Sequence, residues 1–276
     1  MKQNDTKIFK GDYYKWPEDD ITKDMPSIAF DSDDVIVHLK VFFKSLNKVD
    51  KDYYVYDLDD NKVKVHGPNA QTEALKHTER VFAYELYHQW SYLLKPKKSG
   101  WRINAELRKN IEWFYSKDDE TLLFGNASTS TNESSNEFPD MVLHKSQIED
   151  AQLIVCEIKR DDRIMSDIKK DLNRLYLFTI KKDEENKTAD DYYQAFKSGI
   201  FLAINTEFNK IISAIRTRMQ DFVFKGDEKK LDHIICVSSL YNGNDKKPLI
   251  CYQSLGEIIR QIKKGEVELK CEQTII

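Results

Sequence analysis

The chain has 276 residues, of which 33% are charged and 40% are hydrophobic, and its formal net charge is −4. A chain of this length can bury a large core and forms one large domain or two small ones. No stretch approaches the run of about 18 apolar residues typical of a transmembrane helix, and the start lacks the apolar core of a signal peptide, so we expect a cytoplasmic protein without a membrane partner.

The first 68 residues are the least regular part of the chain, and we predict an extension packed on a domain that spans residues 69–276. Ser32, Asp33 and Asp34 precede an apolar run and resemble a helix start, although a run that opens on Val-Ile-Val fits a strand equally well. A hairpin is expected over residues 53–65. The extension is either an element that selects a partner or substrate, or a simple cap.

Residues 69–94 contain no glycine or proline and carry Phe82, Leu86 and Trp90 at helical spacing, which predicts a helix. Glu85 follows Phe82 by three positions and therefore lies on or beside the buried face. A carboxylate there needs a partner or a metal ion. Glu85 is therefore either an acid of a functional site or half of a salt bridge with a nearby Lys or Arg, and Glu79 is its main rival for the site.

A first strand is predicted over residues 101–107, and a Ser/Thr/Asn-rich loop over residues 126–136 leads to the next one. Two short apolar runs, 141–143 and 153–156, are then joined by a polar turn and predict a hairpin. The hairpin opens on Pro139-Asp140 and ends on Glu157-Ile158-Lys159. Because residues two apart share a face of a strand, Glu157 and Lys159 point the same way, and the register places Asp140 across from Glu157.

This hairpin end has the composition of a divalent-metal site. Two facing carboxylates repel each other unless a cation lies between them, and Mg²⁺ prefers oxygen ligands such as carboxylates and phosphates. Lys159 would orient a water molecule or stabilise charge that develops on phosphorus. The alternative is a solvent-facing hairpin end, since acid-x-lysine triplets also occur at residues 167–169, 185–187 and 268–270. The ordered combination of both strands, rather than the triplet alone, favours the metal site.

A helix is predicted over residues 162–180, and Arg160, Arg163, Lys170 and Arg174 in and before it are candidate contacts for a nucleic-acid backbone. For any one of them a solvated surface is the alternative. Strands at 199–205 and 233–238 with a helix at 207–224 between them indicate a crossover, hence a mixed sheet flanked by helices. A helix at 254–264 and a strand at 267–270 are expected near the end of the chain.

The order Pro139-Asp140, apolar strand, turn, apolar strand, Glu157-Ile158-Lys159 resembles the PD-(D/E)xK nuclease superfamily over roughly residues 73–239. The resemblance implies an α/β fold with a central mixed sheet flanked by helices, a restriction-endonuclease-like core in the order α-β-β-β-α-β, and N- and C-terminal extensions. It also implies catalysis by Asp140, Glu157 and Lys159 with an acid from the preceding helix, for which Glu85 is the candidate. Mg²⁺, or Mn²⁺ as a substitute, would bind Asp140, Glu157 and the carbonyl of Ile158.

By this resemblance we expect a metal-dependent phosphodiesterase, with DNA rather than RNA as substrate and an endonuclease role in restriction, phage defence or repair. A catalytically silent module of the same fold, binding nucleic acid or a partner protein in a larger complex, is the alternative, and a hydrolase acting on another phosphoester is a third. The negative net charge counts mildly against a nucleic-acid binder, so we expect a local basic face, a homodimer or a partner protein. The sequence shows neither zinc spacing nor a glycine-rich phosphate loop.

Overall fold

The computed structural model describes residues 33–54, 70–94, 101–105, 123–124, 139–145, 152–160, 163–179, 196–241 and 247–265. In this part of the chain a six-stranded mixed sheet has its strands in chain order. The strands are β1 (Trp101–Ala105), β2 (Met141–Lys145), β3 (Gln152–Arg160), β4 (Ser198–Ile204), β5 (Ile234–Leu240) and β6 (Leu249–Ser254). The pairs β3–β4 and β4–β5 are parallel, and the other three neighbouring pairs are antiparallel.

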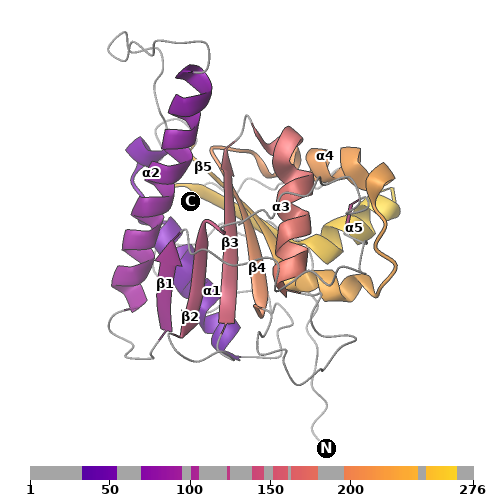
Figure 1. The fold of residues 1–276 in the computed structure, drawn as a ribbon, viewed down its shortest axis with the longest axis horizontal. Helices are drawn as coiled ribbons and strands as arrows, with labels where there is room; N and C mark the ends of the chain where they lie inside the picture. The colour runs from indigo at the N-terminus through magenta and orange to yellow at the C-terminus, as the bar shows by residue number, and fades with distance from the viewer. Residues whose placement is uncertain are drawn as a thin grey trace, which may run out of the picture.

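Helices cover both faces of the sheet, which gives a three-layer α/β arrangement (Figure 1). One face packs against α1 (Asp33–Leu46) and α2 (Ala70–Leu94), and the other against α3 (Ile164–Thr179), α4 (Phe208–Arg218) and α5 (Leu255–Lys263). The described residues also include the short 3-10 helices η1 (Lys51–Tyr53), η7 (Met219–Asp221) and η8 (Glu228–His233). The predicted mixed sheet flanked by helices is therefore confirmed.

The apolar pattern of each element explains its layer. Every residue of β4 is buried, as expected of a parallel strand covered on both faces. The helices α3 and α4 are the two crossovers that join β3 to β4 and β4 to β5, and their buried residues lie in one core cluster. Among the described residues, the elements α2, β1, β2, β3, α3 and β4 occur in the order helix, strand, strand, strand, helix, strand.

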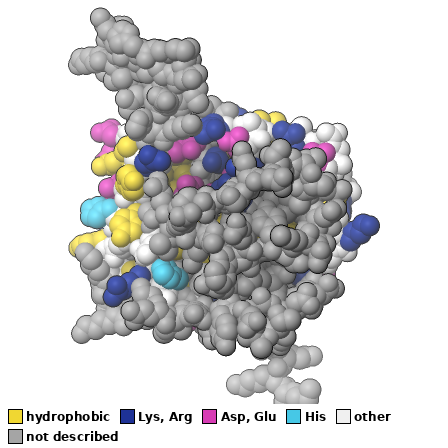
Figure 2. Space-filling model, in the orientation of Figure 1, with side chains coloured by type: hydrophobic (Ala, Val, Ile, Leu, Met, Phe, Trp, Pro, Cys, Tyr) yellow, Lys and Arg dark blue, Asp and Glu magenta, His cyan; other side chains and the backbone are white. Residues whose placement is uncertain are grey.

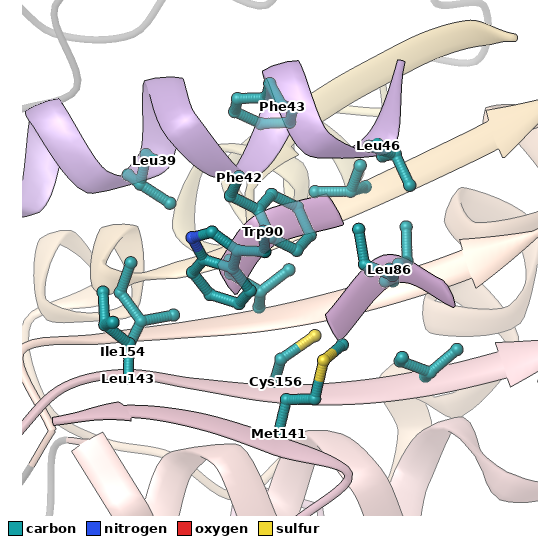
Figure 3. Close-up of a cluster of buried hydrophobic side chains, with 14 of the residues drawn as sticks. Leu39, Phe42, Phe43, Leu46, Leu86, Trp90, Met141, Leu143, Ile154 and Cys156 are labelled. Atoms are coloured by element: carbon teal, nitrogen blue, oxygen red, sulfur yellow. The ribbon is translucent and has the colours of Figure 1, made fainter. Parts of the chain in front are cut away.

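The ambiguous apolar run near the start of the chain is a helix, α1. Leu39, Phe42 and Leu46 of α1 are fully buried at spacings of three and four, and they belong to the same core cluster as Trp90 of α2. Figure 3 shows these side chains between α1, α2 and the sheet. The rings of Phe42 and Trp90 meet edge to face with their centroids 5.0 Å apart. The α1 helix therefore forms part of the core that lies between α1, α2 and the sheet, rather than covering that core as a cap.

The structure differs from the sequence predictions at two places. The helix expected over residues 207–224 ends earlier, because α4 gives way to η7 at Met219. The strand β6 was not predicted, although it pairs along its whole length with β5. The predicted hairpin at 53–65 beyond Tyr54, the loop at 126–136 and the strand at 267–270 lie outside the described residues. Within the ranges that the structure describes, no helix combines the length and apolar character that a membrane crossing requires.

Candidate active site

The end of β3 extends past the start of β2. The last pair between these strands is Met141 with Cys156, whereas β3 continues along β4 to the pair of Arg160 with Ile204. Continuing the β2–β3 register by one residue places Asp140 opposite Glu157, as predicted. The backbone of residues 157–160 therefore has an edge that β2 does not cover, between α2 and α3 (Figure 1).

Two carboxylates accept hydrogen bonds from this edge. Asp140 Oδ2 accepts from the Ile158 amide at 2.6 Å, and Glu79 Oε1 of α2 accepts from the Arg160 amide at 3.1 Å. Alternate residues of a strand direct their N–H and C=O groups to the same edge, so the Ile158 carbonyl lies on the side of Asp140. The edge thus brings together two acids and a backbone carbonyl from three different elements.

The side chains of Glu157 and Lys159 point to the opposite layer, toward α3. Arg174 Nη1 lies 2.8 Å from Glu157 Oε2, and Lys159 Nζ lies 3.6 Å from Asp171 Oδ2. Asp171 Oδ1 is in turn 3.6 Å from Arg174 Nη1. Ile158 packs instead into the core beneath α1 and α2. As predicted, the side chains of Glu157 and Lys159 lie on one face of β3 and that of Ile158 lies on the other.

The ionisable groups of this cluster are strongly perturbed. Burial, and then the charge of Asp140, hold the pKa of Glu157 well above its usual range. Burial likewise raises the pKa of Glu79, and it raises the pKa of Asp171 to about 6. For Lys159, burial alone would lower the pKa, but the four carboxylates around it outweigh burial and raise it. Lys159 is thus a protonated ammonium group, which can donate hydrogen bonds but cannot accept a proton.

Among the α2 acids whose side chains the structure describes, Glu79 rather than Glu85 reaches this cluster. Glu85 accepts hydrogen bonds from Gln89 Nε2 at 2.6 Å, and its other oxygen lies 3.4 Å from His88 Nδ1, so its partners belong to its own helix. Glu79 precedes Phe82 by three positions and so continues the buried stripe of α2 toward its N-terminus. Of the two candidates in the sequence, Glu79 therefore contacts the end of β3 and Glu85 does not, and the catalytic role of a helix acid stays a prediction.

The four basic residues predicted to contact a nucleic-acid backbone are in different environments. Lys170 is exposed, and Arg163 Nε lies 3.3 Å from Asp167 on the surface of α3. Arg160 is partly buried and follows Lys159 at the end of β3. Arg174 is largely buried in its ion pair with Glu157, so it is part of the cluster rather than a surface contact for phosphates. Figure 2 shows acidic and basic side chains mixed along the upper edge of the molecule, over this region.

Glu157 carries the observation that bears on a metal ion. Its Oε1 is buried and has no hydrogen-bond partner among the described residues, whereas its Oε2 is held by Arg174. A buried carboxylate oxygen without a partner is costly, and a cation shared with Asp140 would satisfy it. No group of three His, Cys, Asp or Glu side chains in the described ranges is arranged to hold a metal ion. A Mg²⁺ site needs only one or two carboxylates, with carbonyl, water and phosphate oxygens as the other ligands, so Asp140, Glu157 and Ile158 fit it.

Asp171 was not among the predicted site residues, although the sequence contains a signal for it. Asp171 is three positions after Ile168 and four before Leu175, so it lies on the apolar stripe of α3. A charged residue on a buried helical face needs a charged partner, and here Lys159 and Arg174 supply it. The same argument would have placed Arg174, one turn further along the helix, in the interior.

Comparisons of this sequence with protein-family models, of the chain with curated proteins, and of its fold with solved structures found no match.

Proposed function

We propose that the chain is a Mg²⁺-dependent nuclease that hydrolyses phosphodiester bonds in nucleic acid, with DNA as the substrate. The observation that supports this most is the buried, unpartnered Oε1 of Glu157, on a strand that also carries Lys159 and ends beside Asp140. The helix-strand-strand-strand-helix-strand order from α2 to β4 is that of the restriction-endonuclease-like core and supports the same proposal.

Each residue of the cluster has a defined part in this function. Asp140, Glu157 and the carbonyl of Ile158 would hold the ion, because they are hard oxygen donors brought to one strand end. A bound Mg²⁺ supplies Lewis acidity to the phosphodiester and to the attacking water. The ammonium of Lys159 donates hydrogen bonds to that water or to a phosphate oxygen, and its positive charge opposes the negative charge that develops on phosphorus.

Glu79 supports the site from α2. By accepting the hydrogen bond of the Arg160 amide, it fixes the end of β3 against the helix, and its charge acts on Lys159. Arg160 at the end of β3, Arg163 just before α3 and the exposed Lys170 on α3 remain the candidates for contacts to the nucleic-acid backbone. An endonuclease of restriction, phage defence or repair is the biological role that accords with this chemistry.

The test is cleavage of supercoiled plasmid, linear DNA and RNA by the full chain with Mg²⁺ or Mn²⁺, with EDTA as the metal-free control. We expect metal-dependent cutting that falls by about a hundredfold or more in Lys159→Ala, since a donor to a developing charge is lost. Lys169→Ala is the matched control, because Lys169 lies on α3 in a half-exposed ion pair with Asp221 and should cut normally. Nicking of the plasmid would identify an endonuclease, and loss from the ends an exonuclease.

Absence of cutting by folded protein on both DNA and RNA would overturn the proposal. A gel-shift titration on the same samples would then show whether the chain is a catalytically silent module that binds nucleic acid.

A further inference from the structure

We propose that Asp171 and Arg174 of α3 are positioning residues of this site: Arg174 sets the orientation of Glu157 for cation binding, and Asp171 sets the position of the Lys159 ammonium. This inference rests on the proposed function. It assigns a specific task to a helix that otherwise only covers the sheet.

The contact between Arg174 and Glu157 fixes one of two equivalent oxygens. Arg174 Nη1 donates to Glu157 Oε2 at 2.8 Å, and the side chains are only 12% and 1% exposed. A charge-assisted hydrogen bond between buried groups holds the carboxylate in one rotamer. Because Oε2 is occupied, Oε1 is the oxygen left for a cation. Arg174 thus resembles the residues that hydrogen-bond to a metal-binding carboxylate from outside the coordination sphere and orient it.

Asp171 makes the corresponding contact to Lys159. Its Oδ2 lies 3.6 Å from Lys159 Nζ, and its Oδ1 lies 3.6 Å from Arg174 Nη1. A lysine side chain has four rotatable bonds, so without an anchor its ammonium would sample many positions. Asp171, 2% exposed, restricts the ammonium to the side of Glu157 that faces α3.

A packing role alone does not explain this pair of charges. The neighbouring buried positions of α3 are Ile168, Leu172 and Leu175, so an apolar side chain at 171 would continue the same stripe. Replacing a buried ion pair with apolar residues of similar volume is often neutral or stabilising, so stability alone does not require the charges of Asp171 and Arg174. Here each charge contacts one residue of the Glu-x-Lys triplet.

The two residues therefore have separable effects. Loss of Arg174 leaves Glu157 unoriented and should weaken cation binding. Loss of Asp171 leaves the ion ligands in place but frees Lys159, and should slow the reaction without weakening cation binding to the same extent.

The first arm measures Mn²⁺ binding to the full chain by electron paramagnetic resonance, which requires no substrate. We expect Arg174→Met to bind Mn²⁺ about tenfold or more weakly, the usual cost of removing an outer partner of a metal ligand. Arg174→Lys, which keeps a cation beside Glu157, should recover most of that affinity. Arg216→Met, on the exposed side of α4, is the matched control and should bind like the wild type. Equal or tighter binding by a folded Arg174→Met variant would overturn the inference, because Arg174 would then compete with the cation.

The second arm measures turnover of saturating DNA at saturating Mn²⁺. For Asp171→Asn we expect about a tenfold or larger fall in kcat, with a change in Mn²⁺ affinity of no more than about threefold. Asp221→Asn, which breaks the half-exposed pair with Lys169, is the control that should change neither quantity. An unchanged kcat in Asp171→Asn, or an equal loss of Mn²⁺ affinity and kcat, would show that Asp171 does not act through Lys159.

Thermal melting of every variant shows whether a lost activity comes from unfolding or from misplaced Glu157 and Lys159 side chains in a folded protein. The two proposals also fail differently. If the wild-type chain binds Mn²⁺ but cuts no nucleic acid, the proposed nuclease function is wrong. The Mn²⁺-binding measurement then still tests the role of Arg174. If the wild type and the variants Arg174→Met and Asp171→Asn all cut DNA at the same rate, the nuclease function stands, and the positioning roles of Arg174 and Asp171 are wrong.

Discussion

At the scale of single residues, two glutamates six positions apart on α2 have different environments. Six residues turn an α-helix by about 240°, so Glu79 and Glu85 cannot face the same neighbour. Glu79 accepts the Arg160 amide at the end of β3, whereas Glu85 is held by Gln89 and His88 of its own helix. Rotation about the helix axis therefore decides which acid reaches the site.

This difference leads to a paired prediction. Glu79→Gln should lower metal-dependent cleavage by about tenfold or more, because it removes a charge that acts on Lys159 and weakens the anchor of β3. Glu85→Gln keeps the size of the side chain and should cleave within about twofold of the wild type. Both rates are measured on plasmid DNA under the same Mg²⁺ concentration. The reverse ranking of the two variants would return the helix acid to Glu85.

At the scale of elements, the site forms because the side-chain period of the strand β3 and that of the helix α3 bring charged residues to facing surfaces. The period of two along β3 brings Glu157 and Lys159 to one face, and the period of the helix brings Asp171 and Arg174 to one face of α3. Two residues of the strand thus meet two residues of the helix with opposite charges in each pair. A shift of β3 by one residue would turn both triplet side chains into the other core.

A second contact between elements, away from the site, joins α5 to η8. Arg260 of α5 donates to both carboxylate oxygens of Asp232, which also accepts from Ser254, the N-cap residue of α5. Gly256 lies where these elements come closest. A Cβ at this position would be 2.4 Å from both Asp232 Oδ1 and the Glu228 carbonyl oxygen, so only glycine fits there without displacement of the backbone.

We therefore predict that Gly256→Ala lowers the free energy of unfolding by about 1–3 kcal/mol, the usual cost of overpacking, even though alanine is the better helix former. Urea denaturation followed by circular dichroism measures the change. Lys264→Ala, at the exposed C-terminal end of the same helix, is the control and should stay within about 0.5 kcal/mol of the wild type. A more stable Gly256→Ala variant would show that α5 is not packed this closely on η8.

At the scale of the whole molecule, the sheet separates two apolar cores, one beneath α1 and α2 and one beneath α3, α4 and α5. The site lies where both layers meet the end of β3: Glu79 comes from the first layer, and Asp171 and Arg174 come from the second. Its geometry therefore depends on both cores. Loosening either layer would move some of the charged groups relative to Asp140 and Glu157.

The α1 helix should be essential for this arrangement. Phe42→Ala removes a fully buried ring in contact with Trp90 and should cost about 3–5 kcal/mol of unfolding free energy. Val37→Ala, on the exposed side of the same helix, should cost less than about 0.5 kcal/mol. Tryptophan fluorescence and circular dichroism should report the same urea midpoint. A Phe42→Ala midpoint equal to that of the wild type would make α1 a dispensable cap.

Much of the fold was predictable because it depends on local patterns. Apolar runs bounded by polar turns predicted β2 and β3, helical spacing predicted α2 and α3, and the apolar run at β4 predicted a strand. The strand β6 was missed because its assignment depends on pairing with β5, a long-range contact. The identity of α1 was left open because β-branched residues at its start fit a strand as well.

The sequence by itself determined the order of the described helices and strands from α2 to β5. It also determined the alternation that places Glu157 and Lys159 on one face, since both depend on spacings of a few residues along the chain. Only the tertiary structure decided that Glu79 rather than Glu85 reaches the end of β3, and that Asp171 and Arg174 face the triplet. The physical reason is that the rotation of each helix against the sheet is set by packing of whole apolar faces between distant segments. Local periodicity shows which residues share a face, but contacts between layers determine what that face meets.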